Sequence, residues 1–215
     1  MQTSRVQPCS TLMTTRSTFQ VHAFRLFGGL AILTAMSCAQ SNSPASPATT
    51  QIVRFSADMV APWRPLNDGV MGGLSEGDVV MHDTAMSWKG QTRLENNGGF
   101  ASVRAPWSHT DLRAMDKVVI RCRGNGGPFK LTLETSERWW MPYAYASFSP
   151  SEEWQDVTLK AKEFSWSQAQ MGDLRTVTPS RELGDVLRMG LMKYDGTAQS
   201  FDLEVASIQF LPSGR

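Results

Sequence analysis

Two glycine-rich segments carry the side chains best suited to bind a polar ligand or a cation. Residues 67–75 read NDGVMGGLS and residues 96–102 read NNGGFAS. Asn67 and Asp68 could orient a ligand hydroxyl, and Asp68 could join Asn96 and backbone carbonyls around a hard cation, which takes about six to eight oxygen ligands. The alternative is structural, because Asx side chains bond the backbone of tight turns and glycine adopts positive φ angles without a clash. We favour the turn role for Asp68.

A third segment, residues 139–145 (WWMPYAY), concentrates aromatic side chains. Flat aromatic rings beside amides and carboxylates suit a carbohydrate-binding cleft, because the rings combine a large contact area with polar tips. The competing interpretation places alternate residues inside the fold, with Trp140 beside the small Ala144 and Ala146. One face of the segment would then stay available for a ligand. The candidates on that face are Trp139, Tyr143 and Tyr145.

Arg121 is the cationic candidate. Like Arg104, it could pair with a carboxylate inside a cleft or simply lie along a strand edge. Arg121 and Arg123 also flank Cys122, and cationic neighbours lower the pKa of a thiol. We favour a buried cysteine in a strand over a reactive thiol.

The residue pattern gives little support to catalysis. A metal site would need clustered His, Cys, Asp or Glu residues, yet His82 and His109 stand apart from each other. Gly72 and Gly73, followed by Ser75, lack the lysine and the helix of a phosphate-binding loop. An enzyme would need an ordered histidine–carboxylate pair and is the least supported class. We expect no catalytic residue, no metal and no cofactor.

Residues 1–38 have the layout of a bacterial export signal. They contain no Asp or Glu, and a short apolar run over residues 26–36 follows three arginines. The run is shorter than the roughly 20 residues that a membrane-spanning helix needs. Residues 35–38 (AMSC) resemble a lipobox, which predicts lipidation of Cys38. A cut after Ala39 is the alternative and would release a soluble protein.

Residues 39–50 are typical of a flexible polar tether. Together these segments predict a periplasm-facing lipoprotein of the cell envelope, attached to the membrane by its lipid alone. Ala39, where an aspartate would retain the protein at the inner membrane, favours the outer membrane; a soluble secreted or periplasmic protein is the alternative. Without the signal, 18 Lys and Arg face 20 Asp and Glu. This balance argues against a nucleic-acid partner, which a basic face would mark.

Residues 51–212 form one domain of short alternating segments separated by turns. This pattern predicts an all-β fold, here a two-sheet jelly-roll sandwich. Residues 160–180 indicate a long crossover loop, and residues 181–187 one helical turn. In the last strand the apolar positions change from odd to even, which predicts a β-bulge near Ala206 and Ser207. Two expected inward faces are Val118, Ile120 and Cys122, and Phe129, Leu131 and Leu133.

Residues 67–75 resemble the signature of the complex I intermediate-associated protein 30 family. The resemblance continues collinearly through residues 96–104, 119–124, 154–157 and 201–205, and it covers nearly the whole domain. It implies a galactose-binding-like jelly roll, the architecture of several carbohydrate-binding modules. It also implies an assembly factor of respiratory complex I, chaperone-like and without catalytic activity.

We therefore expect a non-catalytic envelope lipoprotein whose jelly roll binds a protein partner, with a membrane complex among the candidates. The alternative is a carbohydrate-binding module that recognises an envelope glycan. The residues expected to bind the partner or the glycan are Asn67, Asp68, Asn96, Arg121, Trp139, Tyr143 and Tyr145.

Overall fold

The structure is a computed structural model that describes residues 49–168 and 172–214. The chain divides into the units Met1–Pro44 and Ala45–Arg215, and all described residues belong to the second unit. The expected signal, Cys38 and most of the tether lie outside the described residues. Among the residues described, no helix has both the length and the apolar character needed to cross a membrane.

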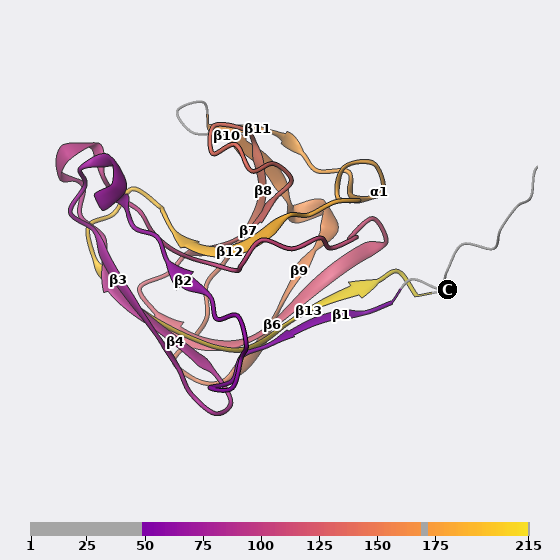
Figure 1. The fold of residues 1–215 in the computed structure, drawn as a ribbon, viewed down its shortest axis with the longest axis horizontal. Helices are drawn as coiled ribbons and strands as arrows, with labels where there is room; N and C mark the ends of the chain where they lie inside the picture. Colours follow the sequence, from indigo (N-terminus) through magenta and orange to yellow (C-terminus); the bar gives the residue numbers. More distant parts are fainter. Residues whose placement is uncertain (1–48, 169–171, 215) are drawn as a thin grey trace, which may run out of the picture. The chain divides into compact units, whose positions relative to one another are not determined.

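The first of two antiparallel sheets, sheet A, has the strand order β3-β4-β13-β6-β9, and β1 pairs with the second half of β13. Its strands are β1 (Gln51–Arg54), β3 (Glu76–Met81), β4 (Met86–Gln91), β6 (Met115–Asn125), β9 (Gln155–Lys160) and β13 (Ser200–Pro212). Figure 1 shows β13 lying between β4 and β6 in the lower layer of the sandwich.

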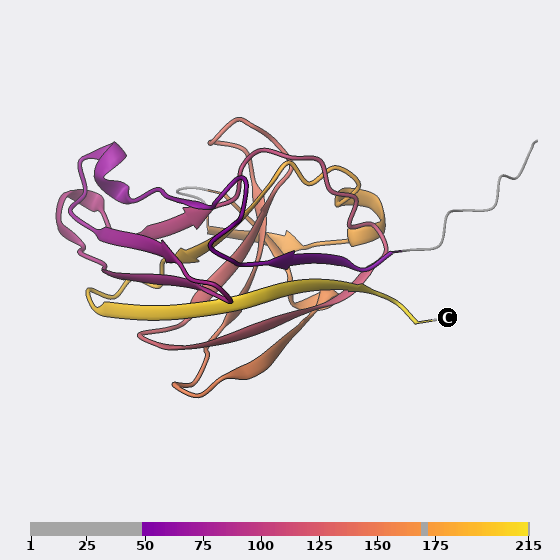
Figure 2. The ribbon, with the colours of Figure 1, turned by 60° about the horizontal axis from the view of Figure 1, so that its bottom comes forward.

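The second sheet, sheet B, has the order β11-β10-β8-β7-β12-β5-β2. Its strands are β2 (Arg64–Pro65), β5 (Ala101–Arg104), β7 (Phe129–Glu134), β8 (Tyr143–Phe148), β10 (Ser165–Gln168), β11 (Gly172–Thr176) and β12 (Arg188–Lys193). The short helices are η1 (Asp68–Met71), η2 (Glu95–Asn97), η3 (Ala161–Glu163) and α1 (Pro179–Glu182). The predicted all-β sandwich of two sheets is confirmed (Figures 1 and 2).

Alternate side chains of both sheets fill the space between the layers. The predicted inward faces of β6 and β7 are confirmed, since all six residues are completely buried. Aromatic side chains occupy the centre, where the Trp88 ring centroid lies 4.7 Å from that of Phe201 and 5.9 Å from that of Phe129. Burying one such side chain contributes roughly 1.5–3 kcal/mol. The alternation read from the sequence therefore defines the core.

Two buried side chains in these strands carry ionisable groups. Cys122 is completely buried, and burial raises the pKa of its thiol to about 12. The interpretation of Cys122 as a buried strand cysteine is thereby confirmed. Lys193, at the end of β12, is also completely buried, and its Nζ lies 2.5 Å from Asp195 Oδ2. The Asp195 carboxylate compensates the buried ammonium group of Lys193, since burying an unpaired charge is costly.

The predicted β-bulge is confirmed and divides β13 into two halves. The pairing register with β6 shifts between Val205 and Ser207. Residues 200–205 also pair with β4, and residues 207–210 pair with β1. The shift keeps Ile208 and Phe210 buried after the change from odd to even positions.

The prediction of a long crossover loop over residues 160–180 is wrong. This stretch contains η3 and the strands β10 and β11, which extend sheet B beyond β8. Phe164 and Trp166 are buried and fasten the segment to the core. The helical turn expected over residues 181–187 begins earlier, at Pro179. Sequence alone missed this hairpin because each of its strands contains a single apolar side chain, Trp166 in β10 and Leu174 in β11. The edge strand β11 is also exposed throughout.

Candidate functional site

Asp68 joins the two glycine-rich segments into one unit. Its side chain is buried, and its carboxylate accepts bonds from the Ser75 N–H (2.8 Å), the Ser75 hydroxyl (2.5 Å), and the N–H groups of Gly99 (2.6 Å) and Phe100 (3.2 Å). Burial by itself would raise the pKa of Asp68, but the bonds from Ser75, Gly99 and Phe100 outweigh burial and lower it. We call residues 67–75 and 93–100 the motif unit. Its geometry favours the turn role of Asp68.

The glycines of the motif unit are required by the closeness of Asp68. A Cβ atom on Gly73 would lie 2.3 Å from Asp68 Cγ, and one on Gly98 would lie 2.6 Å from Asp68 Oδ2. Gly72 ends η1 with φ +86°, a conformation that side-chain-bearing residues rarely adopt. In contrast, a Cβ on Gly69 would meet nothing within 4 Å. The motif is thus the set of residues that lets a buried carboxylate fit between two loops.

The side chains of Asn67 and Asn96 bond to the backbone, Asn67 to β3 and Asn96 within the motif unit. Asn67 Nδ2 donates to the Gly77 carbonyl at 3.2 Å. Asn96 has φ 57°, and its Nδ2 donates to the Gly72 carbonyl at 3.0 Å, which links η2 to η1. Figures 1 and 2 show the two short helices together at one end of the domain. The contacts of Asn67, Asp68 and Asn96 lend no support to a ligand role.

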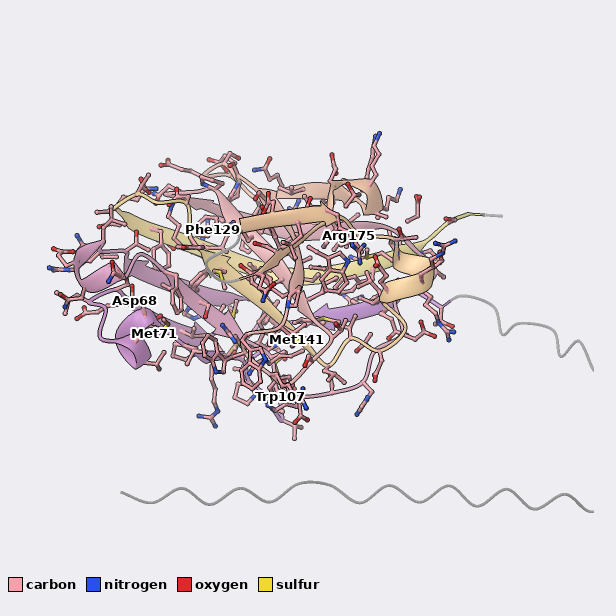
Figure 3. All side chains as sticks on the ribbon, turned by 90° about the horizontal axis from the view of Figure 1, so that it is seen from above. Asp68, Met71, Trp107, Phe129, Met141 and Arg175 are labelled. Carbon is pink, nitrogen blue, oxygen red and sulfur yellow. The ribbon has the colours of Figure 1, made fainter. Side chains whose placement is uncertain are left out.

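The motif unit exposes apolar side chains on its outside. Val70 and Met71 on η1 are 68 % and 64 % exposed, and Leu74 and Leu94 are exposed as well. Figure 3 places Asp68 and Met71 at the same end of the domain. The unit therefore buries the polar side chains of Asp68 and Ser75, while several of its apolar side chains face solvent.

The outer face of sheet B gathers the three tyrosines of the chain. Tyr143 and Tyr145 lie on β8 with ring centroids 6.2 Å apart, and Tyr194 directly follows β12. Lys130 of β7 lies between them, its Nζ 4.4 Å from the Tyr145 ring centroid and 5.3 Å from that of Tyr194. The Tyr145 hydroxyl donates to the Asp173 carboxylate at 2.7 Å. We call this outer side of sheet B the tyrosine face.

The rings of the tyrosine face stand on a floor of smaller side chains. Register pairs Thr132 with Tyr145 and with Gly190, and Met192 with Ser102. All of these floor residues are buried, whereas Tyr143 and Tyr145 are half-buried. Burial raises the pKa of Tyr143 and lowers that of Lys130. The face therefore combines a dry floor with amphipathic rings that can contact a ligand.

An ionic cluster lies on the outer side of sheet B where β7, β12 and β5 are neighbours. The Glu134 carboxylate receives Arg188 Nη2 at 2.6 Å and Arg104 Nη1 at 3.2 Å. The Arg188 guanidinium lies over the Trp107 ring, 3.8 Å from its centroid. Burial lowers the pKa of Arg104, and Glu134 opposes this shift. One carboxylate thus orders two guanidinium groups, and an indole ring supports one of them.

Pockets lie at both sides of the tyrosine face. One pocket of about 430 Å³, beside Tyr145 and Ser147, lies between β8 and β9; another of about 250 Å³ lies at the opposite edge. The smaller pocket is lined by Pro62, Arg64, Pro65, Leu66, Arg104, Ala105, Pro106 and Arg188. An extended ligand crossing the strands would pass from one pocket to the other.

Arg121 and Trp139 lie away from the tyrosines. Arg121 is on the outer face of sheet A, where its Nη1 lies 3.5 Å from Asp156 Oδ1. Trp139 and Trp140 lie in the loop between β7 and β8, and both are exposed. The interpretation that buried Trp140 beside Ala144 and Ala146 is wrong for the tryptophan: the two alanines point into the core, but the strand begins only at Tyr143.

Two arrangements reminiscent of catalysis occur in the described residues. Residues 73–77 (GLSEG) have the Gly-x-Ser-x-Gly spacing of a nucleophile elbow, which sequence reasoning missed. Ser75 is buried, however, and its hydroxyl donates to Asp68 and accepts the Arg93 N–H at 2.9 Å. His109 Nδ1 lies 2.7 Å from Asp185 Oδ1, but both side chains are largely exposed. Within the described ranges no hydroxyl or thiol is hydrogen-bonded to His109, and no group of three potential metal ligands is found.

The two antiparallel sheets define a jelly-roll sandwich. Residues 53–205, more than two thirds of the chain, match the family Complex I intermediate-associated protein 30 (CIA30). This protein belongs to that family, as the motif indicated. A comparison with curated proteins finds no match.

Solved structures with a similar fold include carbohydrate-binding modules. One is the family 11 module of the cellulosomal cellulase Lic26A-Cel5E of Clostridium thermocellum, with TM-score 0.55 and 12 % identity over 77 % of this chain and 97 % of that one. Another is the family 11 module from Clostridium thermocellum in complex with a β-1,3-1,4-mixed-linked tetrasaccharide, with TM-score 0.53 and 10 % identity over 76 % and 96 %. At such identities the likeness shows the shared fold.

Sequence reasoning found part of the tyrosine face and missed its ionic members. Tyr143 and Tyr145 were among the candidates, and the structure brings them together. The residues missed are Lys130, Glu134, Arg188, Trp107 and Tyr194. For Lys130, Glu134 and Arg188, which lie in strands, the alternation of the sequence predicts only that the side chains face outward. No local sequence pattern shows that β7, β8 and β12 are neighbours.

Proposed function

We propose that this protein is a non-catalytic binding protein whose tyrosine face receives a glycan chain. The observation that carries the proposal is the gathering of Tyr143, Tyr145 and Tyr194 on one side of sheet B. Tyrosine rings offer a flat apolar surface for the C–H faces of a sugar, and their hydroxyls bond its polar groups. The face is ordered before binding, because Asp173 and Lys130 hold Tyr145.

The dimensions of the face suit an extended oligosaccharide. Four strand-to-strand steps separate β8 from β2 in the sheet order. Neighbouring strands lie about 4.8 Å apart, so these steps span roughly 19 Å. Several linked sugar rings fit along that path, between the pocket beside Tyr145 and the pocket beside Arg64. The shared fold of the two carbohydrate-binding modules is consistent with this use of the sheet.

Alanine variants on the tyrosine face test the proposal. Tyr143→Ala and Tyr145→Ala should each weaken retention on a glycan array or in affinity electrophoresis by about tenfold or more, because truncating a central aromatic contact removes at least about 1.4 kcal/mol of binding. Trp154→Ala on the opposite sheet is the matched control, since Trp154 contacts Arg121 and Arg123 there. Glycan binding that survives both tyrosine substitutions would sink the proposal.

A protein partner at the motif unit is a second candidate function. It rests on the exposed Val70, Met71, Leu74 and Leu94, which the buried Asp68 holds in a fixed arrangement. Sequence reasoning preferred a protein partner, in the manner of complex I assembly factors. The tyrosine face, which combines aromatic rings with charged groups, supports a glycan as its ligand. The exposed apolar side chains of the motif unit suit a protein interface.

Affinity capture from intact membranes separates this candidate from the first. Val70→Asp and Met71→Asp should abolish capture of a reproducible partner, with Val80→Asp as control because Val80 is a similarly exposed residue on β3. Failure to recover any partner with the wild-type chain would count heavily against a protein partner at the motif unit.

The proposed location is the cell envelope, with Cys38 lipidated and the outer membrane as the preferred membrane. It rests on the sequence of residues 1–38. Mass spectrometry of the mature N-terminus tests it: a diacylated or triacylated Cys38 is expected. A mature chain that begins after Ala39 would instead identify a soluble exported protein.

A further inference from the structure

Three arginines from three strands line the smaller pocket at the edge of the tyrosine face. Arg64 of β2, Arg104 of β5 and Arg188 of β12 surround a space of about 250 Å³. Arg64 stands directly opposite Arg104 in the register between β2 and β5. Like charges directly opposite one another destabilise a sheet. We call this space the arginine pocket.

The arginine pocket holds more cations than carboxylates. On sheet A, three ion pairs each join one cation to a carboxylate of its own: Lys89 with Asp202, Arg121 with Asp156, and Arg123 with Glu204. In the pocket, Arg104 and Arg188 share Glu134 alone. Within the described parts of the chain, the Arg64 side chain has no hydrogen bond or ion pair. Three guanidinium groups therefore face one carboxylate.

Two of the three guanidinium groups, those of Arg104 and Arg188, are held in place before any ligand arrives. Glu134 receives both the Nε and the Nη2 of Arg188, at 3.1 and 2.6 Å, and Trp107 lies against the same guanidinium. The side chains of Arg104 and Arg188 are only 19 % and 16 % exposed. Pro62, Pro65 and Pro106 complete the wall and restrict the backbone around it. Ordered cations bind an anion with little loss of side-chain entropy.

We propose that the arginine pocket binds the carboxylate of an acidic sugar residue, within a glycan that lies on the tyrosine face. This inference rests on the proposed function and names the class of glycan. A guanidinium presents parallel N–H donors that match the two oxygens of a carboxylate. The pocket volume equals about eight waters at about 30 Å³ each, which suits one sugar ring with its carboxylate. The neighbouring rings of the chain would then cross Gly190 toward Tyr145.

Arg64 is the residue with which to test the inference. Unlike Arg104 and Arg188, it is exposed and makes no ion pair that its removal would break. Arg64→Ala and Arg64→Glu should therefore leave the melting temperature close to that of the wild type. Arg54→Ala is the matched control, because Arg54 is an exposed arginine in β1 of sheet A.

The probes are polygalacturonate, alginate and hyaluronan, each compared with its carboxyl-reduced form, and a neutral β-1,3-1,4-glucan. The wild-type chain should bind at least one acidic polysaccharide about tenfold more tightly than its reduced form. Arg64→Ala should remove most of that preference, Arg64→Glu should abolish binding of the acid form, and Arg54→Ala should change neither. The preference should also weaken as salt rises, since exposed charges are screened.

The outcomes separate this inference from the proposed function. Equal binding of acidic and reduced forms, or binding of the neutral glucan only, overturns the acidic-sugar inference and leaves the glycan proposal standing. Binding of no polysaccharide contradicts both. An acidic peptide that binds through Arg64 while the acidic polysaccharides do not would assign the pocket to a protein ligand and overturn the inference.

Discussion

The motif unit and the tyrosine face are built in opposite ways. The motif unit consists of two contiguous segments arranged around the buried side chains of Asp68 and Ser75. The tyrosine face combines alternate residues of β7, β8, β12 and β5 and turns their polar groups outward. The most recognisable part of the sequence therefore reflects a folding requirement. The residues able to contact a ligand leave only a scattered trace in the sequence.

The difference follows from what each region must achieve. A buried carboxylate needs several donors close at hand, and consecutive N–H groups of tight turns provide them. Glycine is then needed wherever a Cβ atom would clash with the carboxylate. This steric requirement by itself accounts for the glycine-rich motif. A binding face needs only that suitable side chains meet, and any strand of the sheet can contribute one.

The largest effect on this comparison is expected from Asp68→Asn. The amide cannot accept all of the bonds from Ser75, Gly99 and Phe100, and a buried donor left without a partner is costly. We expect a loss of about 2–4 kcal/mol in the free energy of unfolding, measured by urea denaturation at pH 7. Asp78→Asn, at an exposed position of β3, should change it by less than about 0.5 kcal/mol. Equal values for the two variants would refute the structural role.

Gly73→Ala should have the next largest effect. The added Cβ would lie 2.3 Å from Asp68 Cγ, so either the loop or the carboxylate must shift. Overpacking of this kind destabilises by about 1–3 kcal/mol. Gly69→Ala, four residues earlier in the same motif, meets nothing within 4 Å and should change stability by less than about 0.5 kcal/mol. Thermal melts of the two variants measure this difference: Gly73→Ala should lower the melting temperature, and Gly69→Ala should leave it nearly unchanged.

The contribution of Asp68 should also depend on pH. Its pKa in the folded state is lowered from 3.8, so between the two values the unfolded chain binds more protons and stability rises with pH. The stabilisation is complete above the unfolded pKa and is lost as pH falls through the folded one. The difference between the wild type and Asp68→Asn should therefore shrink below about pH 4. A difference that stays constant down to the acid transition would contradict the charged state assigned to Asp68.

The smallest effect on stability is expected from Tyr145→Phe. This change removes a bond to the Asp173 carboxylate, but that carboxylate is exposed to water, unlike the one of Asp68. We expect a change within about 1 kcal/mol in chemical denaturation. Glycan retention should fall less than for Tyr145→Ala, because the ring remains. A larger loss of stability than for Asp68→Asn would reverse the comparison between the two regions.

Local patterns predicted the strands and failed where pairing decides the structure. The switch from odd to even apolar positions located the bulge between Val205 and Ser207, because each half of β13 must keep its apolar side chains in the core. Each of β10 and β11 contains one apolar side chain, too few to show alternation, and the strands form because β10 pairs with β8 and β11 pairs with β10. Trp140 fits the alternation of Ala144 and Ala146 in the sequence, but it lies in the loop before β8.

The same division holds for the candidate site. Tyr143 and Tyr145 were identifiable because they lie two residues apart in one strand and share a face. Arg121 was grouped with them by residue type, and the structure places it on the other sheet. Arg64, Arg104 and Arg188 lie far apart in the chain, and only the order β12-β5-β2 makes them neighbours.

By itself the sequence determined the all-β alternation, the family signature and the turn chemistry around Asp68. These depend on residues within a few positions of one another, where side-chain periodicity and glycine geometry act directly. Only the tertiary structure decided which outward-facing side chains meet. Strand order and register are non-local properties, and they converted dispersed tyrosines and arginines into a face with a cationic pocket at its edge.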